Sequence, residues 1–302
     1  MAITWSPLAT HPTPCDVSEA EWGLMIWLAD VRYASTGQVA QWLEMTDRAA
    51  GYHVRKLSQA GYLQSTYWHN GRQRYHVWTV SRHGGTLLAA TDERWRDQHD
   101  QWLSVPDQGV KGKSVLHALD RNQVVLDMLV NADQLRWHAA WNLPTRRYVE
   151  PVSGARLVPD ALVTVHGHLW LIEMERSWRG STLQDKITQY DAFYSNRGWG
   201  RYMRVLPRVL LVASSSSTQE RNLDTWLDQF DSYRFPWMAV LPWSELQDQW
   251  RCWVWPRTGP RQLVGWVDLH NAAKTPIQPP PQPTAARRLR VRHRDSDTPW
   301  LD

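Results

Sequence analysis

Length, composition and charge limit what this chain can be. It has 302 residues, of which 42% are hydrophobic, and its formal net charge is +4. That length and apolar content allow two domains with cores of their own. No apolar run reaches the length of a membrane span, and the N-terminal residues lack the basic and apolar pattern of a signal peptide. We therefore expect a cytoplasmic protein with no membrane partner.

The cysteines and the basic residues narrow the class of protein further. Cys15 and Cys252 lie far apart in the sequence, which excludes a disulfide framework and a zinc finger. The pI is about 9.1, and most cations are arginines, whose planar guanidinium suits phosphate groups. A polyanionic partner is therefore expected. The chain also has 21 Trp against 3 Phe. We interpret most of these tryptophans as core residues and a few as candidates for stacking on bases.

The N-terminal part of the chain has the pattern of a winged helix. After a flexible arm at 1–16, helical periodicity covers three segments: 17–33, 35–43 and 47–59. Ser18 and Glu21 form a capping-box signature for the first helix, Thr46 caps the third, and Gly61 ends it. Strand-like segments follow at 62–68 and 72–80, around a hairpin turn at 69–71. We predict a winged helix-turn-helix domain over 17–92.

Cations lie on the two elements that a winged helix places against DNA. The outward face of the third helix offers Arg48, His53, Arg55 and Lys56, and the wing offers Arg72, Gln73 and Arg74. We predict that these residues bind double-stranded DNA, with the helix in the major groove and the wing on the backbone or in the minor groove. Two other interpretations stay open. Helix-turn-helix folds also serve as protein docking modules, and surface arginines are often merely solvated.

A polar linker at 93–113 separates this domain from a second one, predicted over 114–270. Helical and strand-like segments alternate there, beginning with a helix near 116–130, which predicts an α/β domain (α+β) with a mixed sheet. From residue 271 a proline-rich stretch leads into an arginine-rich run, which predicts a disordered basic tail over 271–302. This tail either binds nucleic acid without sequence preference or is simply solvated.

The most informative stretch is an apolar hairpin that carries acids. Strands near 157–165 and 169–175 flank a tight turn at 166–168. Asp160 lies at the start of the first strand, and Glu173 and Glu175 end the second. Residues two apart in a strand point to the same face, and the hairpin folds Asp160 back toward that face. Clustered carboxylates among apolar residues need a cation, typically a divalent metal ion. The alternative is that these acids are solvated rim positions.

This order of elements resembles the PD-(D/E)XK nuclease core, on the residues Pro159-Asp160 and Glu173-Met174-Glu175. With a winged helix before it, the chain resembles the replication-relaxation family, associated with plasmids and other mobile elements. The supporting pieces are Thr79–Gly84 at the end of the wing, His117 at the start of the second domain's first helix, Val158–Ala161, Leu171–Glu175 and Lys186–Tyr190.

The resemblance implies a metal-dependent catalytic site. Asp160 and Glu173 would be ligands of Mg²⁺ or Mn²⁺. Glu175 stands where a lysine is expected, so it would be a further ligand, and Lys186 on the following helix would supply the missing ammonium group. Three residues would support the site: His117, Gln189 and Tyr190.

Three functions follow from these features. The first is a DNA endonuclease or nickase of mobile-element replication or transfer, targeted by the winged helix. The second is a non-catalytic replication initiator or transcriptional repressor that keeps a degenerate nuclease fold. The third is a protein-docking module that uses exposed tryptophans, with a homodimer as one form.

Overall fold

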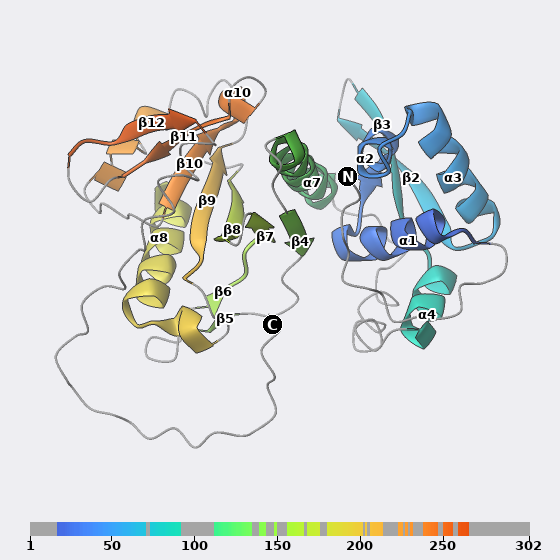
Figure 1. Cartoon of the computed structure of the whole chain (residues 1–302), viewed down its shortest axis with the longest axis horizontal. Coiled ribbons are helices and arrows are strands. Elements are labelled where there is room, and N and C mark those ends of the chain that lie inside the picture. Colours follow the sequence, from blue (N-terminus) through green and yellow to red (C-terminus); the bar gives the residue numbers. More distant parts are fainter. Residues whose placement is uncertain are drawn as a thin grey trace, which may run out of the picture. The chain divides into compact units, whose positions relative to one another are not determined.

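The computed structural model describes two compact units, residues 1–143 and 144–302 (Figure 1). The residues that it describes are 17–70, 73–91, 112–134, 139–142, 148–149, 156–165, 168–175, 180–201, 203, 206–213, 223–225, 227–228, 230–231, 238–246, 250–255 and 259–265. The predicted arm at 1–16, nearly all of the predicted linker and the predicted basic tail lie outside these residues. Each unit is described by itself below.

The first unit contains the predicted winged helix. Its helices are α1 (Glu19–Val31), α2 (Thr36–Trp42), α3 (Asp47–Gln59) and α4 (Arg82–Thr91). The wing is formed by β2 (Leu63–Asn70) and β3 (Gln73–Val80), and the short β1 (Ala34–Ser35) pairs antiparallel with β3. The sheet order is β1-β3-β2. Three helices followed by an antiparallel hairpin confirm the fold expected from the sequence.

Side-chain caps fix where these helices begin. The Ser18 hydroxyl accepts from the Glu21 backbone N–H at 3.3 Å, and the Glu21 carboxylate accepts from the Ser18 backbone N–H at 2.9 Å. The predicted capping box is therefore confirmed, and Thr46 caps α3 in the same way through the Ala49 N–H. Ser35 and Gln38 form a second capping box at the start of α2. Each cap satisfies backbone groups that the first turn of a helix leaves unbonded.

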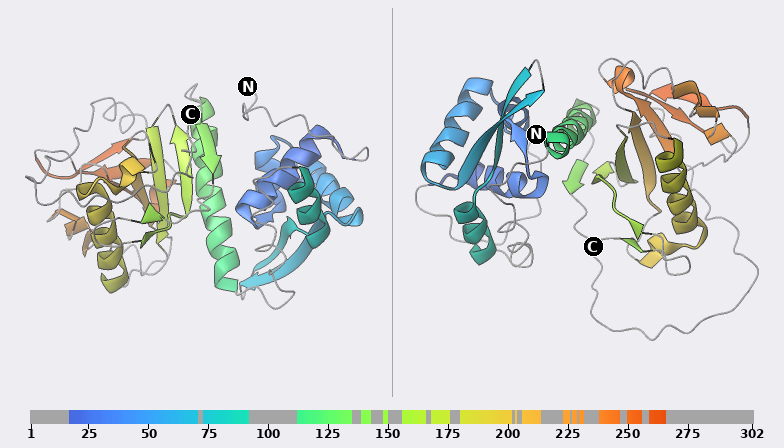
Figure 2. Two further views of the ribbon diagram at one scale, coloured as in Figure 1. Left: turned by 90° about the horizontal axis from the view of Figure 1, so that it is seen from below. Right: turned by 180° about the vertical axis from the view of Figure 1, so that it is seen from behind.

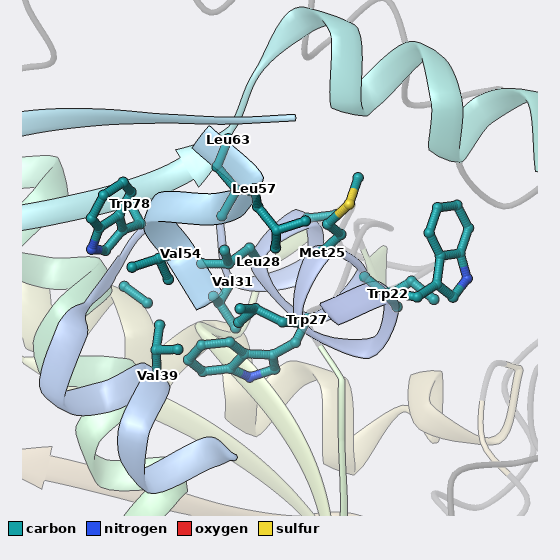
Figure 3. Packing of buried hydrophobic residues seen from close by; sticks show 14 of the residues in the cluster. Trp22, Met25, Trp27, Leu28, Val31, Val39, Val54, Leu57, Leu63 and Trp78 are labelled. Carbon is teal, nitrogen blue, oxygen red and sulfur yellow. The ribbon is translucent and has the colours of Figure 1, made fainter. Parts of the chain in front are cut away.

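The core of the first unit gathers the apolar faces of the helices against the wing (Figure 3). Trp22, Met25, Trp27, Leu28 and Val31 come from α1 and meet residues of α2, α3 and the two wing strands. The Trp27 ring is buried and stacks on the Trp42 ring, with centroids 4.9 Å apart and planes at 6°. Tryptophans thus fill core positions here, as their apolar surroundings in the sequence predicted.

The long helix α7 (Gly112–Gln134) and strand β4 (Ala139–Asn142) also belong to the first unit, which ends at residue 143. Hydrogen bonds from buried side chains tie α7 to the other helices of this unit. Arg121 donates to the Val31 carbonyl at 2.9 Å, Asn122 donates to the Tyr33 carbonyl at 2.6 Å, and Gln38 donates to the Leu119 carbonyl at 2.6 Å. The bonds from Arg121 and Asn122 satisfy carbonyls at and just after the end of α1, and only the tertiary structure reveals them.

The second unit is built on a mixed sheet. The strands of this sheet that lie within residues 144–302 are β7 (Ala161–Val165), β8 (His168–Glu175), β9 (Arg208–Ala213), β10 (Met238–Pro242), β11 (Arg251–Val254) and β12 (Gln262–Gly265), and they follow one another in the order β12-β11-β10-β9-β8-β7. Neighbours β8, β9 and β10 run parallel, and the outer pairs are antiparallel. Smaller elements are β5 (Tyr148–Val149), β6 (Arg156–Leu157), the 3-10 turn η1 (Gly198–Arg201) and α10 (Trp243–Leu246). The predicted mixed sheet is therefore confirmed.

Helix α8 (Gly180–Ser195) lies along one face of this sheet, beside β9 and β10 in the views of Figures 1 and 2. Its buried residues are Ile187, Tyr190, Phe193 and Tyr194. They pack against alternate residues of the parallel strands, among them Leu171, Leu211 and Val240. One face of β8 is therefore covered by α8, and acidic residues on that face of β8 point toward the helix. None of the described helices of either unit is long and apolar enough to cross a membrane.

Two glycines in helices of the first unit test the packing of that unit, because we expect alanine at these positions to change stability in opposite directions. A Cβ added at Gly23, inside α1, meets no atom within 4 Å, whereas a Cβ at Gly84, in α4, overlaps the Tyr62 carbonyl oxygen and lies 3.0 Å from Val80. We expect Gly23→Ala to raise the free energy of unfolding by about 1 kcal/mol and Gly84→Ala to lower it by about 1–3 kcal/mol. Urea titration followed by tryptophan fluorescence measures both. Equal effects of the two substitutions would contradict the packing.

Candidate functional sites

The exposed face of α3 carries two arginines and a tyrosine. Arg48, Tyr52 and Arg55 are all exposed, and Tyr52 is 60% accessible. Their spacing of four and three residues places them on one side of the helix. The opposite side of α3 contributes Val54 and Leu57 to the core. The predicted DNA-binding residues Arg48 and Arg55 are thus available to a partner, and Tyr52 between them is a residue that the sequence reasoning missed.

The other two cations predicted for this surface are bound to α1. Glu21 Oε1 lies 3.0 Å from His53 Nδ1, and Glu21 Oε2 accepts a hydrogen bond from Lys56 Nζ at 2.7 Å. The Glu21 side chain is only 2% exposed. His53 and Lys56 therefore direct their nitrogens toward a buried carboxylate of α1, although the Lys56 side chain remains 41% exposed. The partners are 32 and 35 residues apart in the sequence, so no local pattern predicted this pairing.

Burial by itself would raise the pKa of Glu21. Hydrogen bonds from Lys56, Ser18 and His53 outweigh burial and lower the pKa of Glu21 to about 2. Each of these bonds stabilises the charged form of the carboxylate. Glu21 is consequently a structural anion that joins the first turn of α1 to the second half of α3.

The structure describes only part of the predicted wing contacts. Arg72 lies outside the described residues, and Gln73 and Arg74 are placed in β3, where they pair with Asn70 and His69 of β2. On the described part of the wing, Tyr67 is 54% exposed, and its ring stacks on His76 of β3 at 4.6 Å and 13°. Tyr67 and His76 are cross-strand neighbours. The alternation of residues along β2 could have predicted the exposure of Tyr67, because every second residue of a wing strand faces away from the core.

In the second unit, the acidic hairpin brings three carboxylates to the α8 side of the sheet. Glu173 and Glu175 alternate with the core residues Leu169 and Leu171 along β8, so they share the face covered by α8. Ala161 pairs with Ile172, and the Asp160 N–H donates to the Ile172 carbonyl, so Asp160 lies across from Glu173. Asp160 Oδ2 in turn accepts from the Met174 N–H at 2.8 Å.

Helix α8 supplies the partners of the central carboxylate. Glu173 is 4% exposed, and its two oxygens accept hydrogen bonds from Lys186 Nζ at 2.8 Å and from the Tyr190 hydroxyl at 2.7 Å. Lys186 Nζ also lies 3.6 Å from Glu175 Oε2. Lys186 and Tyr190 are four residues apart and therefore neighbours on one helix face. The ammonium group of Lys186 thus reaches back to the hairpin from the following helix.

The two remaining predicted residues are Gln189 and His117. Gln189 is half-buried on α8, next to Tyr190, whereas His117 is half-buried on α7, which belongs to the first unit. The carboxylate–lysine site accordingly consists of Asp160, Glu173, Glu175, Lys186 and Tyr190.

The charges of this site depend on burial and on each other. Burial raises the pKa of Glu173, Lys186 lowers it, and Asp160 raises it again, so the net shift is upward. Burial lowers the pKa of Lys186, but the neighbouring carboxylates outweigh this and hold it above its usual value. Burial and Glu173 together raise the pKa of Tyr190 well above its usual value. Lys186 therefore keeps its proton, and Tyr190 stays a hydrogen-bond donor.

The carboxylate oxygens of this site are possible ligands for a divalent metal ion. Across the described residues of both units, no three His, Cys, Asp or Glu side chains converge as a metal-binding group. Asp160 and Glu173 nonetheless offer a facing pair of carboxylates, which are hard oxygen donors. Mg²⁺ and Mn²⁺ favour such donors, and Mg²⁺ commonly takes one or two carboxylates and keeps water as its other ligands. The pair therefore fits such an ion.

These features define a winged-helix protein whose second unit carries a carboxylate–lysine site on a mixed sheet. The profile of the replication-relaxation family matches residues 25–209, which is more than half of the chain. This chain therefore belongs to the replication-relaxation family, as the sequence motifs indicated. The match includes α3, the wing, the acidic hairpin and α8, and the family's description connects the chain with replication.

Comparison with solved structures finds two single-residue variants of ZitR from Lactococcus lactis. Each is 12% identical to this chain and covers 43% of it and 81% of its own length, with TM-scores of 0.25 and 0.24. No curated protein matches the chain.

The low pKa of Glu21 predicts a pH-dependent contribution to stability. Its value of about 2 lies below the usual 4.5, so the contribution is complete above pH 4.5, declines as the pH falls, and is lost near pH 2. The shift corresponds to about 3 kcal/mol. We expect Glu21→Gln to remove this much stability at pH 7 and little at pH 2, as measured by urea unfolding of the first unit.

A matched control is available in the same helical turn. Glu19 is exposed, so Glu19→Gln should change the free energy of unfolding only slightly at either pH. A difference between wild type and Glu21→Gln that stays constant from pH 7 to pH 2 would contradict the role given to Glu21.

Proposed function

We propose that the first unit binds double-stranded DNA through α3 and the wing, and that the protein acts in the replication of plasmids or other mobile elements. The observation that carries this proposal is the exposed face of Arg48, Tyr52 and Arg55 on α3. A helix fits the major groove of B-form DNA, and arginine makes bidentate contacts with phosphates and with guanine. Membership of the replication-relaxation family supports the connection with replication.

The salt dependence of DNA binding tests how much the charges of this surface contribute to the affinity. Each phosphate contact releases counterions on binding, so the affinity falls with salt in proportion to the number of contacts. We expect Arg48→Ala with Arg55→Ala to reduce the slope of log affinity against log salt by about 2. Fluorescence anisotropy with a labelled duplex of mixed sequence, over a series of salt concentrations, measures this slope.

The control variant is Arg82→Ala, which removes one exposed cation from α4, outside α3 and the wing. It should keep the slope of the wild type. Absence of duplex binding by the wild type at low salt, or an unchanged slope in the double variant, would contradict DNA binding by α3 and favour the protein-docking function.

We further propose that the carboxylate–lysine site hydrolyses phosphodiester bonds of DNA with Mg²⁺ or Mn²⁺. The observation that favours this activity is Lys186, whose ammonium group contacts Glu173 at 2.8 Å from the helix that follows the hairpin. Nuclease sites of the PD-(D/E)XK type need such a group beside their acids. Lys186 would take this part, since Glu175 stands at the position where the resemblance expects lysine.

Asp160 and Glu173 would hold the ion, with Glu175 as a further candidate ligand. When bound, the ion activates a water molecule and stabilises the negative charge that develops on the phosphate. The chain's own residues orient the donors: the Met174 N–H fixes Asp160, and the Tyr190 hydroxyl fixes Glu173. The Lys186 ammonium group offsets charge near the reacting phosphate and orients the attacking water.

The non-catalytic alternative rests on the same contacts. Lys186 and Tyr190 engage both oxygens of Glu173, so a degenerate site would remain folded with no metal ion at all. A DNA-binding initiator or repressor would then keep the hairpin and α8 for stability alone. Cleavage separates this alternative from the nuclease.

The cleavage test uses supercoiled plasmid with Mg²⁺ or Mn²⁺, followed by gel electrophoresis. We expect Asp160→Asn and Lys186→Met each to slow nicking by about 100-fold or more, because each removes a group that contacts the ion, the water or the phosphate. Asp185→Asn is the matched control, since Asp185 is exposed beside Lys186 on α8, and it should nick at the rate of the wild type. Nicking by the wild type no faster than by Asp160→Asn would establish the non-catalytic alternative.

A further inference from the structure

The residues along α3 divide into two sets with different surroundings. His53 and Lys56 are held by the buried Glu21 on α1. Arg48, Tyr52 and Arg55 are exposed on another side of the helix. Glu21 therefore ties His53 and Lys56 to α1, whereas Arg48 and Arg55 take no part in this contact. On the exposed side of α3, one aromatic side chain lies between two guanidinium groups.

We propose that Tyr52 reads base edges in the major groove, while Arg48 and Arg55 fix the helix on the duplex. This inference rests on the proposed binding of DNA by α3, and it assigns sequence selectivity to one side chain. The assignment begins with exposure. The exposed large apolar side chains of the described residues are Tyr52, Tyr67 and Val158, and Tyr52 is the one on the helix that would enter the groove.

The exposed side chain of Tyr52 contributes little to the packing of the fold. Its ring is 60% accessible, and it meets the edge of His53, its neighbour in the chain, at 5.5 Å. The apolar contacts of α3 with the core come from Ala50, Val54 and Leu57 on the other side. Tyrosine combines a large rigid apolar surface with a hydrogen-bonding hydroxyl, which suits a recognition surface better than a purely solvated position.

The spacing of the three residues fits the repeat of DNA. Arg48 and Arg55 are seven residues apart, which corresponds to about 10 Å along a helix. That distance equals about three base-pair steps of 3.4 Å. Tyr52 lies between them, one turn from either arginine. The Arg55 guanidinium lies back over Gly51, 3.6 Å from where a Cβ would be, so it occupies the turn of α3 that carries Tyr52.

The chemistry of the ring points to an A·T base pair. In the major groove, thymine presents a methyl group and an acceptor oxygen, and adenine presents an acceptor and a donor. An aromatic ring makes apolar contact with the thymine methyl, and a phenolic hydroxyl both donates and accepts. Tyr52 is thereby expected to select a central A·T pair, flanked by positions where the arginines contact phosphate or guanine.

The experiment first selects the preferred duplex of the full-length wild type from a randomised library. The affinities of wild type, Tyr52→Ala, Tyr52→Phe and Arg48→Ala are then measured on the selected duplex and on a scrambled one, at several salt concentrations. We expect Tyr52→Ala to weaken binding to the selected duplex by about 10- to 100-fold, with the scrambled affinity and the salt slope unchanged. Arg48→Ala should weaken binding to both duplexes and lower the slope by about 1.

Two further variants make the result specific. Tyr52→Phe keeps the ring, so it should retain the preference for the A·T pair if the thymine methyl is the main contact, and it should lose that preference if the hydroxyl is. Either result assigns base reading to Tyr52 and identifies the atoms. Arg82→Ala, on α4 outside α3 and the wing, should keep the selectivity of the wild type.

The outcomes separate this inference from the proposed function. A wild type that binds neither duplex overturns DNA binding by α3 and the role of Tyr52 with it. A wild type that selects a duplex, together with a Tyr52→Ala variant that keeps full selectivity, overturns the role of Tyr52 alone. Loss of selectivity in Arg82→Ala equal to that in Tyr52→Ala would also overturn the role of Tyr52.

Discussion

The carboxylate of Glu173 constrains the second unit more than any other group. It is buried on the face of β8 that α8 covers, where an unpaired charge is very costly. Lys186 and Tyr190 satisfy it from α8, four residues apart on one side of the helix. This requirement fixes both the rotation of α8 against the sheet and the register of the hairpin, because a slip of one residue would turn Glu173 to the other face.

The first unit also contains a buried carboxylate that needs basic partners. Glu21 is buried in the first turn of α1, and Lys56 and His53 of α3 are its partners. In both units a buried acid is matched by a basic side chain from another element, a helix, so charge pairing and helix docking depend on each other. The consequences differ. In the first unit the pairing ties His53 and Lys56 of α3 to α1, and in the second it positions the Lys186 ammonium group beside two further carboxylates.

Much of the fold follows from local sequence, because caps, turns and apolar periods act over a few residues. Ser18 with Glu21 and the pattern of the wing predicted their elements correctly, and the spacing of Asp160, Glu173 and Lys186 indicated which residues the hairpin and α8 bring together. The docking of α7 did not follow, because α7 is held by hydrogen bonds from Arg121 and Asn122 to carbonyls about 90 residues away. The ties of His53 and Lys56 to Glu21 were hidden for the same reason. An amphipathic pattern tells which side of a helix is buried, but not which distant polar group a surface cation will meet.

We propose that Asp160 and Glu173 form a site for a divalent cation and not merely a buried ion pair with Lys186. Isothermal titration calorimetry with Mn²⁺ tests it without any assay of cleavage, on the full-length protein and on Glu173→Gln, with Asp185→Asn as the control. We expect stoichiometric binding by the wild type and by Asp185→Asn, and at least tenfold weaker binding by Glu173→Gln, because one of the two anionic ligands is lost. Absence of Mn²⁺ binding by the wild type, or equal binding by Glu173→Gln, would show that the carboxylate–lysine site serves the fold alone.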